Sequence, residues 1–270
     1  MSKNVTLVIA AVLVVIALAG GIWLYDFVLG DTEAASAPIS APTLEVSASA
    51  TPAPTATIAP TQAAPTQAAP TQAALPEATA PTQGDPPAAS SQGSLVNYQI
   101  SQDESQVRFN IYELLRGQPK DVIGVSNQIA GQVAVDLNDL STAQMGEIVI
   151  NARTLETDDS RRNQAIRNRI LFTDQYEFIN FKPTQISGLS GSAVPGQSFT
   201  FQVNGDLTIK DVTRPVTFDV TVMVESPERL IGSAKTSIAL ADFNLSVPSV
   251  PFVANVGETM ALETDFVLTP

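Results

Sequence analysis

The chain has 270 residues, and its 14 Lys and Arg against 27 Asp and Glu give a formal net charge of −13. It contains neither His nor Cys, which excludes imidazole bases, Cys–His and Ser–His–Asp nucleophiles, and thiolate or imidazole metal sites. The acidic charge also argues against a nucleic-acid partner, which would need a concentrated basic surface. We therefore expect no metal, no cofactor and no nucleic acid.

The chain begins with an apolar run. Val5–Leu24 carries no charge and is 20 residues long, about the length that a helix needs to cross the ~30 Å hydrocarbon core of a membrane. Lys3 precedes the run, and the aromatic residues Trp23 and Tyr25 lie at its far end, as is typical of a lipid interface. We predict a membrane anchor over residues 1–30, with everything that follows outside the cytoplasm.

A cleaved secretory signal is the alternative to an anchor. Ala17-Leu18-Ala19 is a small-x-small pattern of the kind that precedes cleavage, but apolar residues continue through Leu29, which favours the anchor. Both interpretations export the rest of the chain. The protein is expected in the cell membrane with its C-terminal domain periplasmic or at the cell surface, or secreted if the signal is cleaved.

Residues 31–94 have the composition of a disordered linker. From Ala34 to Ser94 the chain has 19 Ala, 11 Pro, 9 Thr and 7 Ser and no aromatic residue, so it buries too little apolar surface to offset its ordering entropy. The unit A-P-T-Q recurs within it, too short for a packed structural repeat. Fully extended, this spacer would reach roughly 190 Å at ~3.1 Å per residue.

Residues 95–270 have the pattern of a folded domain. Hydrophobic and polar residues alternate in one run after another, which is typical of strands with one buried and one solvated face. Turn signals at Pro119-Lys120-Asp121, Gly188–Gly196 and Ser226-Pro227-Glu228 separate the runs. The alternating residues include Val107, Phe109, Ile111, Val133, Val135, Ile148, Ile150, Ile179, Phe181, Phe199, Phe201, Leu207, Ile209, Phe218, Val220, Ile238, Leu240, Met260, Leu262, Phe266 and Leu268.

About eight such strands predict an all-β antiparallel meander that stacks as a sandwich or closes as a barrel, and closure also removes exposed edges. One short helix is predicted between Asp158 and Leu171, with Asp158 or Asp159 as its N-cap and Ile166 and Ile170 on one face. Its other face is basic, which indicates either an anion or lipid-headgroup site or a solvated face paired with carboxylates. The basic residues are Arg161, Arg162, Arg167 and Arg169.

Four motifs of this domain match a known family. Tyr98-Gln99-Ile100 with Ser105–Phe109 is similar to Y-x-I-x(4)-S-x-V-x-F, and Gly131 begins a G-x-V strand. Thr154–Phe181 is similar to T-x(4)-R-D-x(2)-L followed by F and Y-P-x-I-x-F. Gly205–Val216 is similar to G-x-L-T-I-K-G-V-T-K-P-V, the most specific of the motifs. From about residue 96 to residue 268 the chain thus resembles the YceI-like family, the bacterial lipid- or polyisoprenoid-binding proteins.

The chain also departs from the family pattern. Glu104 lies about where the family has a His, Asn163 where it prefers Asp, Glu177 where it has Pro, and Asp211 where it has Gly. Residues 243–256 are unlike the usual ending. These differences leave the implied fold unchanged and concern the identity of the ligand.

The resemblance implies an extended, lipocalin-like antiparallel barrel that holds an isoprenoid or other long-chain apolar lipid in its lumen. An eight-stranded barrel has room for one slender ligand, and each buried CH₂ contributes roughly 0.8 kcal/mol, so such a ligand needs few polar contacts. We expect the ligand-binding residues among the inward members of the alternating runs. They are Phe109, Ile111, Phe172, Phe181, Phe201, Phe218, Ile238 and Phe266.

We therefore predict a non-enzymatic, membrane-tethered lipid-binding protein. The alternative is a non-enzymatic surface or interaction module whose barrel is filled by its own side chains. An enzyme would have to use carboxylates such as Asp158-Asp159 or the Ser-Lys pair of Ser233-Ala234-Lys235, without an evident oxyanion hole or neighbouring base.

Overall fold

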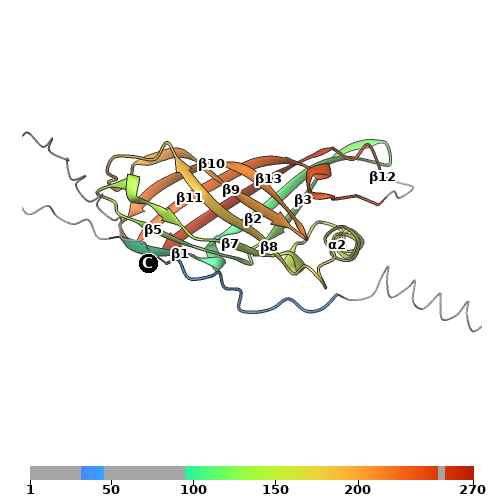
Figure 1. Cartoon of the computed structure of the whole chain (residues 1–270). Helices are drawn as coiled ribbons and strands as arrows, with labels where there is room; N and C mark the ends of the chain where they lie inside the picture. The colour runs from blue at the N-terminus through green and yellow to red at the C-terminus, as the bar shows by residue number, and fades with distance from the viewer. Residues whose placement is uncertain (1–31, 46–94, 249–252) are drawn as a thin grey trace, which may run out of the picture. The chain divides into compact units, whose positions relative to one another are not determined.

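The computed structural model describes residues 32–45, 95–248 and 253–270. In these ranges the chain forms one strongly curled antiparallel sheet with one short helix, which confirms the all-β prediction (Figure 1). No helix of the described ranges is both long and apolar enough to cross a membrane. The predicted anchor, residues 1–30, and residues 46–94 of the predicted linker lie outside the described residues.

The sheet runs in the order β4-β7-β8-β9-β10-β11-β13-β1-β5-β6. Strand β2 pairs with β13, β3 and β12 and is off this path. The strands are β1 Val96–Ile100, β2 Gln106–Leu115, β3 Gln118–Ser126, β4 Ile129–Ala130, β5 Gln132–Val135, β6 Gln144–Met145, β7 Ile148–Asn151, β8 Phe178–Ser187, β9 Ser198–Ile209, β10 Val212–Ser226, β11 Arg229–Ala239, β12 Val253–Ala254 and β13 Thr259–Thr269.

Strand β13 brings the two halves of the sheet together. One edge of β13 pairs with β11 over ten residues, whereas the other edge is shared between two partners. Leu268 and Thr269 pair with β1, and residues 261–265 pair with β2. The described residues form 13 strands, more than the predicted eight, partly because β4, β6 and β12 are pieces of two residues each. We call the curled sheet the barrel.

Several of the turns between strands contain residues with positive φ, among them the β2–β3 and β9–β10 turns. The loops at Gly188–Gly196 and Pro227-Glu228 were predicted and are confirmed. The turn predicted at Pro119-Lys120-Asp121 was wrong: these residues lie inside β3, and the chain reverses at Arg116 (φ 53°) and Gly117 (φ 78°). Positive φ at both central residues is the geometry of a type I′ hairpin. Pro119 is tolerated because β3 has only β2 as a ladder partner.

The predicted helix is confirmed between Asp158 and Leu171. It comprises α2, Ser160–Ala165, and a π-helical turn over Ile166–Leu171. Asp159 is its N-cap, since its carboxylate accepts hydrogen bonds from the backbone N–H groups of Arg161 (2.9 Å) and Arg162 (3.1 Å). Within the described ranges the chain also forms 3₁₀ turns at Gln102–Glu104, Leu140–Thr142, Ala152–Thr154 and Leu240–Phe243.

A short N-terminal segment lies on the outside of the barrel. Residues 32–45, which we call the strap, fall within the predicted linker, yet they run along the barrel surface from the helix to β5 (Figure 1). Ile39 is only 5% exposed and packs with Ala130 and Val149 in a small apolar cluster. The barrel therefore includes a piece of chain that is separated from its other residues by the Ala/Pro/Thr-rich segment.

Candidate functional site: the barrel lumen

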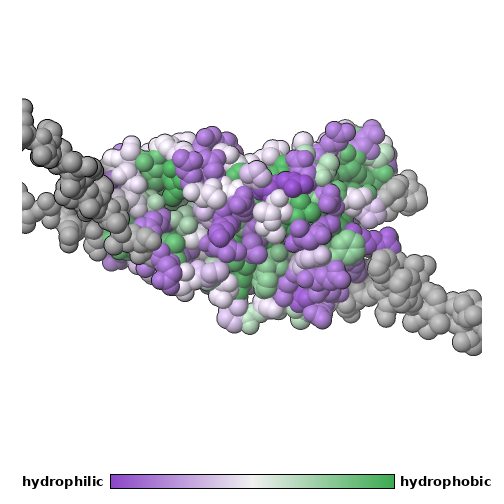
Figure 2. Space-filling view, viewed as in Figure 1, coloured by the Kyte–Doolittle hydropathy of each residue, from purple (hydrophilic) through white to green (hydrophobic). Residues whose placement is uncertain are grey.

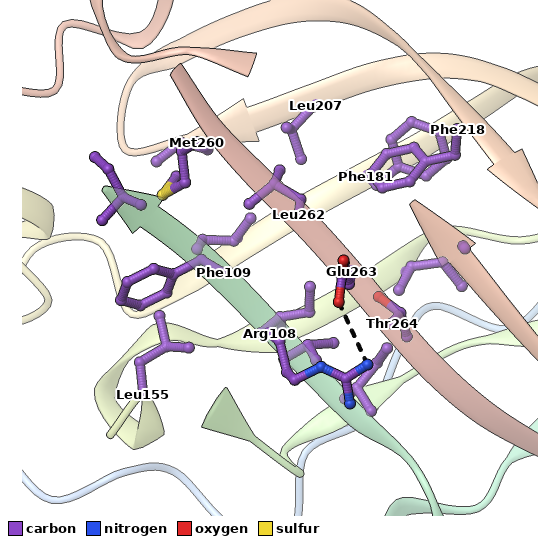
Figure 3. Close-up of a pocket in the computed structure, with 18 of the residues that line it drawn as sticks. Arg108, Phe109, Leu155, Phe181, Leu207, Phe218, Met260, Leu262, Glu263 and Thr264 are labelled. Carbon is purple, nitrogen blue, oxygen red and sulfur yellow. Dashed lines mark hydrogen bonds and ion pairs between the residues drawn. The ribbon is translucent and has the colours of Figure 1, made fainter. Parts of the chain in front are cut away.

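A cavity of about 1050 Å³ fills much of the barrel interior. Its wall is mainly aliphatic and aromatic. The lining residues come from both ends of the barrel, with Leu140 at one end and Leu115 and Arg161 at the other. Figure 3 shows Phe109, Phe181 and Phe218 projecting from different strands around this space. The period-two alternation of the strands creates the wall, because every second residue of β2, β9, β10 and β13 faces inward.

Six of the eight predicted lumen residues line this cavity, although their role in ligand binding stays a prediction. Phe181 and Phe218 contact each other edge to face, with ring centroids 4.9 Å apart. The six residues are Phe109, Ile111, Phe181, Phe201, Phe218 and Phe266.

The other two predicted residues lie elsewhere. Phe172 is 39% exposed, because it ends the π-helical turn in a left-handed conformation (φ 50°) that carries the chain out of the helix. The Lys210 ammonium lies 5.4 Å from the centre of its ring. Ile238 is buried in the core with Phe243 and is not among the residues that line the cavity.

Three glycines allow phenylalanine rings to lie flat against the wall. A Cβ on Gly124 would come within 2.1 Å of the ring of Phe109, its partner across the β2–β3 ladder. In the same way, a Cβ on Gly232 would meet Phe266 at 2.6 Å. A Cβ on Gly205 would meet the Phe181 ring at 2.6 Å. At each glycine the phenylalanine ring occupies the space that a side chain would take. Because the rings lie against the wall at these positions, the lumen stays open.

The cavity is polar at the end where α2 and the β2–β3 turn lie, which we call the helix end. Lys120 donates to Asp158 (2.5 Å), Arg162 donates to the same carboxylate (2.5 Å), and Arg162 also donates to Glu113 (3.0 Å). Glu113 faces inward from β2, and its side chain is 8% exposed. This chain of ion pairs joins the β2–β3 hairpin to the helix across the end of the lumen.

One carboxylate of this ion-pair chain, that of Asp158, has a lowered pKa. The hydrogen bond from Lys120, together with the charge of Arg162, lowers the pKa of Asp158 from its ordinary value. Arg169 also lines the cavity, and its buried Nε has no hydrogen-bond partner among the described residues. The helix end thus offers a cationic donor to a ligand atom.

The groups weighed for catalysis have other positions or partners. Asp158 belongs to the ion-pair chain, and Asp159 caps the helix. Ser233 and Lys235 lie exposed on the outer face of β11, away from the cavity. Across the described ranges, no group of three or more acidic residues is placed to hold a metal ion.

Sequence reasoning missed part of the wall and the polar end. Met260, Leu262 and Leu207 line the cavity and belong to alternating runs, so the same period-two signal that identified the phenylalanines would have found them. Glu113 and Lys120 were not expected, because an inward charge interrupts the alternation that marks a buried face.

The chain is similar to several known proteins. A UPF0312 protein of Staphylococcus aureus (strain bovine RF122 / ET3-1) is 27% identical over 144 residues, which cover 53% of this chain and 75% of the relative. A polyisoprenoid binding domain from Saccharophagus degradans, implicated in plant cell wall breakdown, superposes with a TM-score of 0.50 at 13% identity, over 64% of this chain and 97% of that chain. BcnA of Burkholderia cenocepacia gives a TM-score of 0.48 at 18% identity, over 62% of this chain and 98% of that one.

The model of the YceI-like domain matches residues 98–268, nearly the whole barrel. The motifs that suggested this resemblance fall in β1, β2, β5, the region from the helix to β8, and the β9–β10 hairpin. The chain therefore belongs to the YceI-like family.

Proposed function

We propose that this protein binds an isoprenoid or other long-chain apolar lipid in the barrel lumen. The observation that carries the proposal is the cavity of about 1050 Å³ with its apolar wall. Ordinary small-molecule sites measure roughly 300–1,000 Å³, and well-packed protein interiors contain few voids larger than a water molecule. The cavity thus argues against the alternative of a barrel filled by its own side chains.

We further propose that the polar end of the ligand lies at the helix end. A long hydrocarbon chain gains about 0.8 kcal/mol for each CH₂ that leaves water, whereas a head group needs a polar partner. Among the cavity residues, Arg161, Arg162 and Arg169 provide donors beside Glu113 and Asp158. Binding and release of such a ligand require no catalytic group, which supports a non-enzymatic role.

The third part of the proposal is attachment to a membrane. Val5–Leu24 has the length and composition of a spanning helix, and the flanking Lys3 favours a cytoplasmic N-terminus. The barrel would then work outside the cytoplasm, close to the membrane that supplies or receives the lipid.

Lipid binding is tested by mass spectrometry of residues 32–270, followed by organic extraction. We expect a co-purifying long-chain lipid. Phe201→Trp should narrow the lumen and lower retention of the long prenyl alcohol solanesol, whereas Phe172→Trp, outside the cavity, should leave retention unchanged. No retained lipid in the parent protein, with loss of thermal stability in Phe201→Trp alone, would reject the proposal in favour of a filled barrel.

Membrane attachment is tested with the full chain. A reporter that is active only outside the cytoplasm, fused after Pro270, should give a signal, and release of the protein should require detergent. Release without detergent would indicate cleavage after Ala19 and reject the anchor.

A further inference from the structure

The strap is fixed to the helix end of the barrel by a buried arginine. The Arg153 side chain is only 7% exposed, and its guanidinium donates to Glu33 (2.8 Å) and to the Ala34 carbonyl (2.9 Å). The same guanidinium donates from Nε to the carbonyl of Thr173 (3.0 Å), just after the π-helical turn that lines the cavity. The Glu33 N–H donates to Asp174 (3.0 Å). The first residues of the strap are thus tied to the segment that closes the helix end.

A second group of contacts lies in the middle of the strap. Glu177, whose side chain is 15% exposed, accepts hydrogen bonds from the N–H (2.6 Å) and hydroxyl (2.9 Å) of Ser36. Asn151 donates to the same carboxylate (2.8 Å). Further along, Ile39 fills the apolar cluster on β4 and β7. Polar contacts thus alternate with an apolar one along the strap, which holds this segment against the barrel at several points.

The last contact places the end of the strap beside the start of the barrel. The Leu44 N–H donates to the side chain of Gln132 (3.0 Å) at the beginning of β5. Val96, where the barrel begins, pairs with Val135, three residues further along β5. Three strand residues span roughly 10 Å. Residues 45 and 95, which bound the Ala/Pro/Thr-rich segment, therefore lie close together at the same edge of the barrel.

This geometry changes which part of the chain sets the distance to the membrane. Eight residues separate Leu24, at the end of the apolar run, from Glu33, so the two are at most about 30 Å apart along an extended chain. The Ala/Pro/Thr-rich segment, in contrast, begins and ends at the same edge of the barrel, so its length adds nothing to that distance.

We propose that the strap, and not the Ala/Pro/Thr-rich segment, connects the barrel to the membrane, and that it holds the helix end of the lumen toward the lipid headgroups. The proposal rests on the membrane anchor of the proposed function. A longer or shorter segment between residues 45 and 95 then leaves the distance from the barrel to the membrane unchanged.

The surface near the strap contact suits a lipid surface. Phe172 (39% exposed) directly precedes Thr173 and Asp174, which bind the strap, and Phe178 (36% exposed) follows at the start of β8. Arg161 is exposed on α2. Figure 2 shows one face of the barrel, where apolar and polar side chains lie interspersed. Aromatic rings and arginines are the side chains that favour the headgroup region of a membrane.

A disulfide tests whether the strap is seated. A Cβ on Gly146 would lie 3.4 Å from the Leu44 Cβ, close to the Cβ–Cβ distance in disulfides. The natural chain has no cysteine that could compete with an introduced pair. In the full chain, Leu44→Cys/Gly146→Cys should cross-link on mild oxidation. A protease site inserted after Pro70 should then cut the chain without separating its two parts. The control pair Leu44→Cys/Ser233→Cys, with Ser233 exposed on β11, should not cross-link; equal cross-linking of both pairs would overturn the proposal.

Energy transfer to labelled headgroups tests the orientation. The full chain is reconstituted in phosphatidylcholine–phosphatidylglycerol vesicles with an acceptor dye on the lipid headgroups, and a donor is attached at Arg161→Cys or, at the far end, at Ser192→Cys. We expect stronger transfer from position 161. A 30-residue Gly/Ser insert, about 30 Å as a coil, should reduce this transfer about two-fold or more when placed after Gly30 and leave it unchanged when placed after Pro70.

Equal effects of the two inserts, or stronger transfer from position 192, would overturn the proposal. Neither readout needs a ligand in the lumen, so an empty barrel rejects the proposed lipid binding and leaves the strap standing. Failure of the chain to enter vesicles would reject the membrane anchor, and with it the proposal that the strap connects the barrel to the membrane. The disulfide would then report only on the docking of residues 32–45.

Discussion

Single residues set the bore of the lumen. Three phenylalanine rings lie against Gly124, Gly205 and Gly232, where an added Cβ would come within 2.1 to 2.6 Å of a ring carbon. Elsewhere on the wall, aliphatic side chains project into the cavity. The three glycines therefore help to determine the volume of the cavity.

Gly124→Ala should push the Phe109 ring into the lumen and lower the amount of bound long-chain lipid. Overpacking usually costs about 1–3 kcal/mol, and we expect the lower end here, about 1 kcal/mol, because the open cavity accepts the displaced ring. Urea unfolding and lipid extraction measure the two effects. Adding Phe109→Leu should restore lipid binding; a double variant that stays empty would contradict this explanation.

Individual side chains outside the alternating pattern were the hardest to predict. Glu177, a departure from the family motif, is the carboxylate that receives Ser36 of the strap. Asp211 is another departure from the family motif. The left-handed residue of the β9–β10 turn is Lys210 (φ 57°), so Asp211 does not need positive φ. Such roles depend on partners far away in sequence, which no local pattern contains.

At the scale of elements, the helix and the β2–β3 hairpin depend on each other. The ion-pair chain from Lys120 through Asp158 and Arg162 to Glu113 is the polar link between them. An inward carboxylate at a mostly apolar cavity is stable only with its partner in place.

Arg162→Gln should therefore destabilise the barrel by roughly 1–3 kcal/mol, because Glu113 loses its charged donor. The double variant Arg162→Gln/Glu113→Gln should recover most of this loss. Arg161→Gln, an exposed neighbour on the same helix, should change the free energy of unfolding by less than about 0.5 kcal/mol. Urea denaturation measures all three, and equal losses for Arg161→Gln and Arg162→Gln would refute the role of the ion pair.

The elements themselves followed from local pattern. Period-two alternation identified the strands, and an Asp before two isoleucines four apart identified the helix and its cap. The Pro119 turn was misplaced because proline also occurs on edge strands, where it replaces no ladder hydrogen bond. Phe172 was expected in the lumen, but its own left-handed conformation after the π-helical turn directs it outward.

The whole molecule includes a contact that composition concealed. The strap shares the Ala, Pro and Thr content of the segment after it, so the entire range was interpreted as a linker. Ile39 and Leu44 are the larger aliphatic residues of the strap, and each contacts the barrel. Two residues in a low-complexity stretch are too weak a signal to predict docking.

Docking of the strap should depend on pH. Burial alone would raise the pKa of Glu177, but hydrogen bonds from Ser36 and Asn151 and the charge of Arg153 outweigh it and hold the pKa below its ordinary value. A lowered pKa means that the carboxylate stabilises docking at all pH values above the free glutamate pKa of about 4.3. This contribution is lost as the pH falls through the lowered pKa.

Hydrogen exchange, corrected for intrinsic rates, measures this effect at the Ser36 amide. Protection of that amide should be high near neutral pH and fall in acid, while the amides of β9 stay protected. Glu177→Gln should reduce protection at neutral pH and flatten its pH dependence. Equal protection of Ser36 at both pH values in the parent protein would contradict the role of this carboxylate.

Residues 45 and 95 lie at the same edge of the barrel, and this placement has an evolutionary consequence. A-P-T-Q units are prone to gain and loss during replication, and in a true tether each change would move the barrel relative to its lipid source. Because residues 45 and 95 lie at the same edge of the barrel, such changes leave that distance unchanged under our proposal. Lineages of this protein should therefore vary freely in the number of A-P-T-Q units, while selection keeps constant the spacing between Leu24 and Glu33.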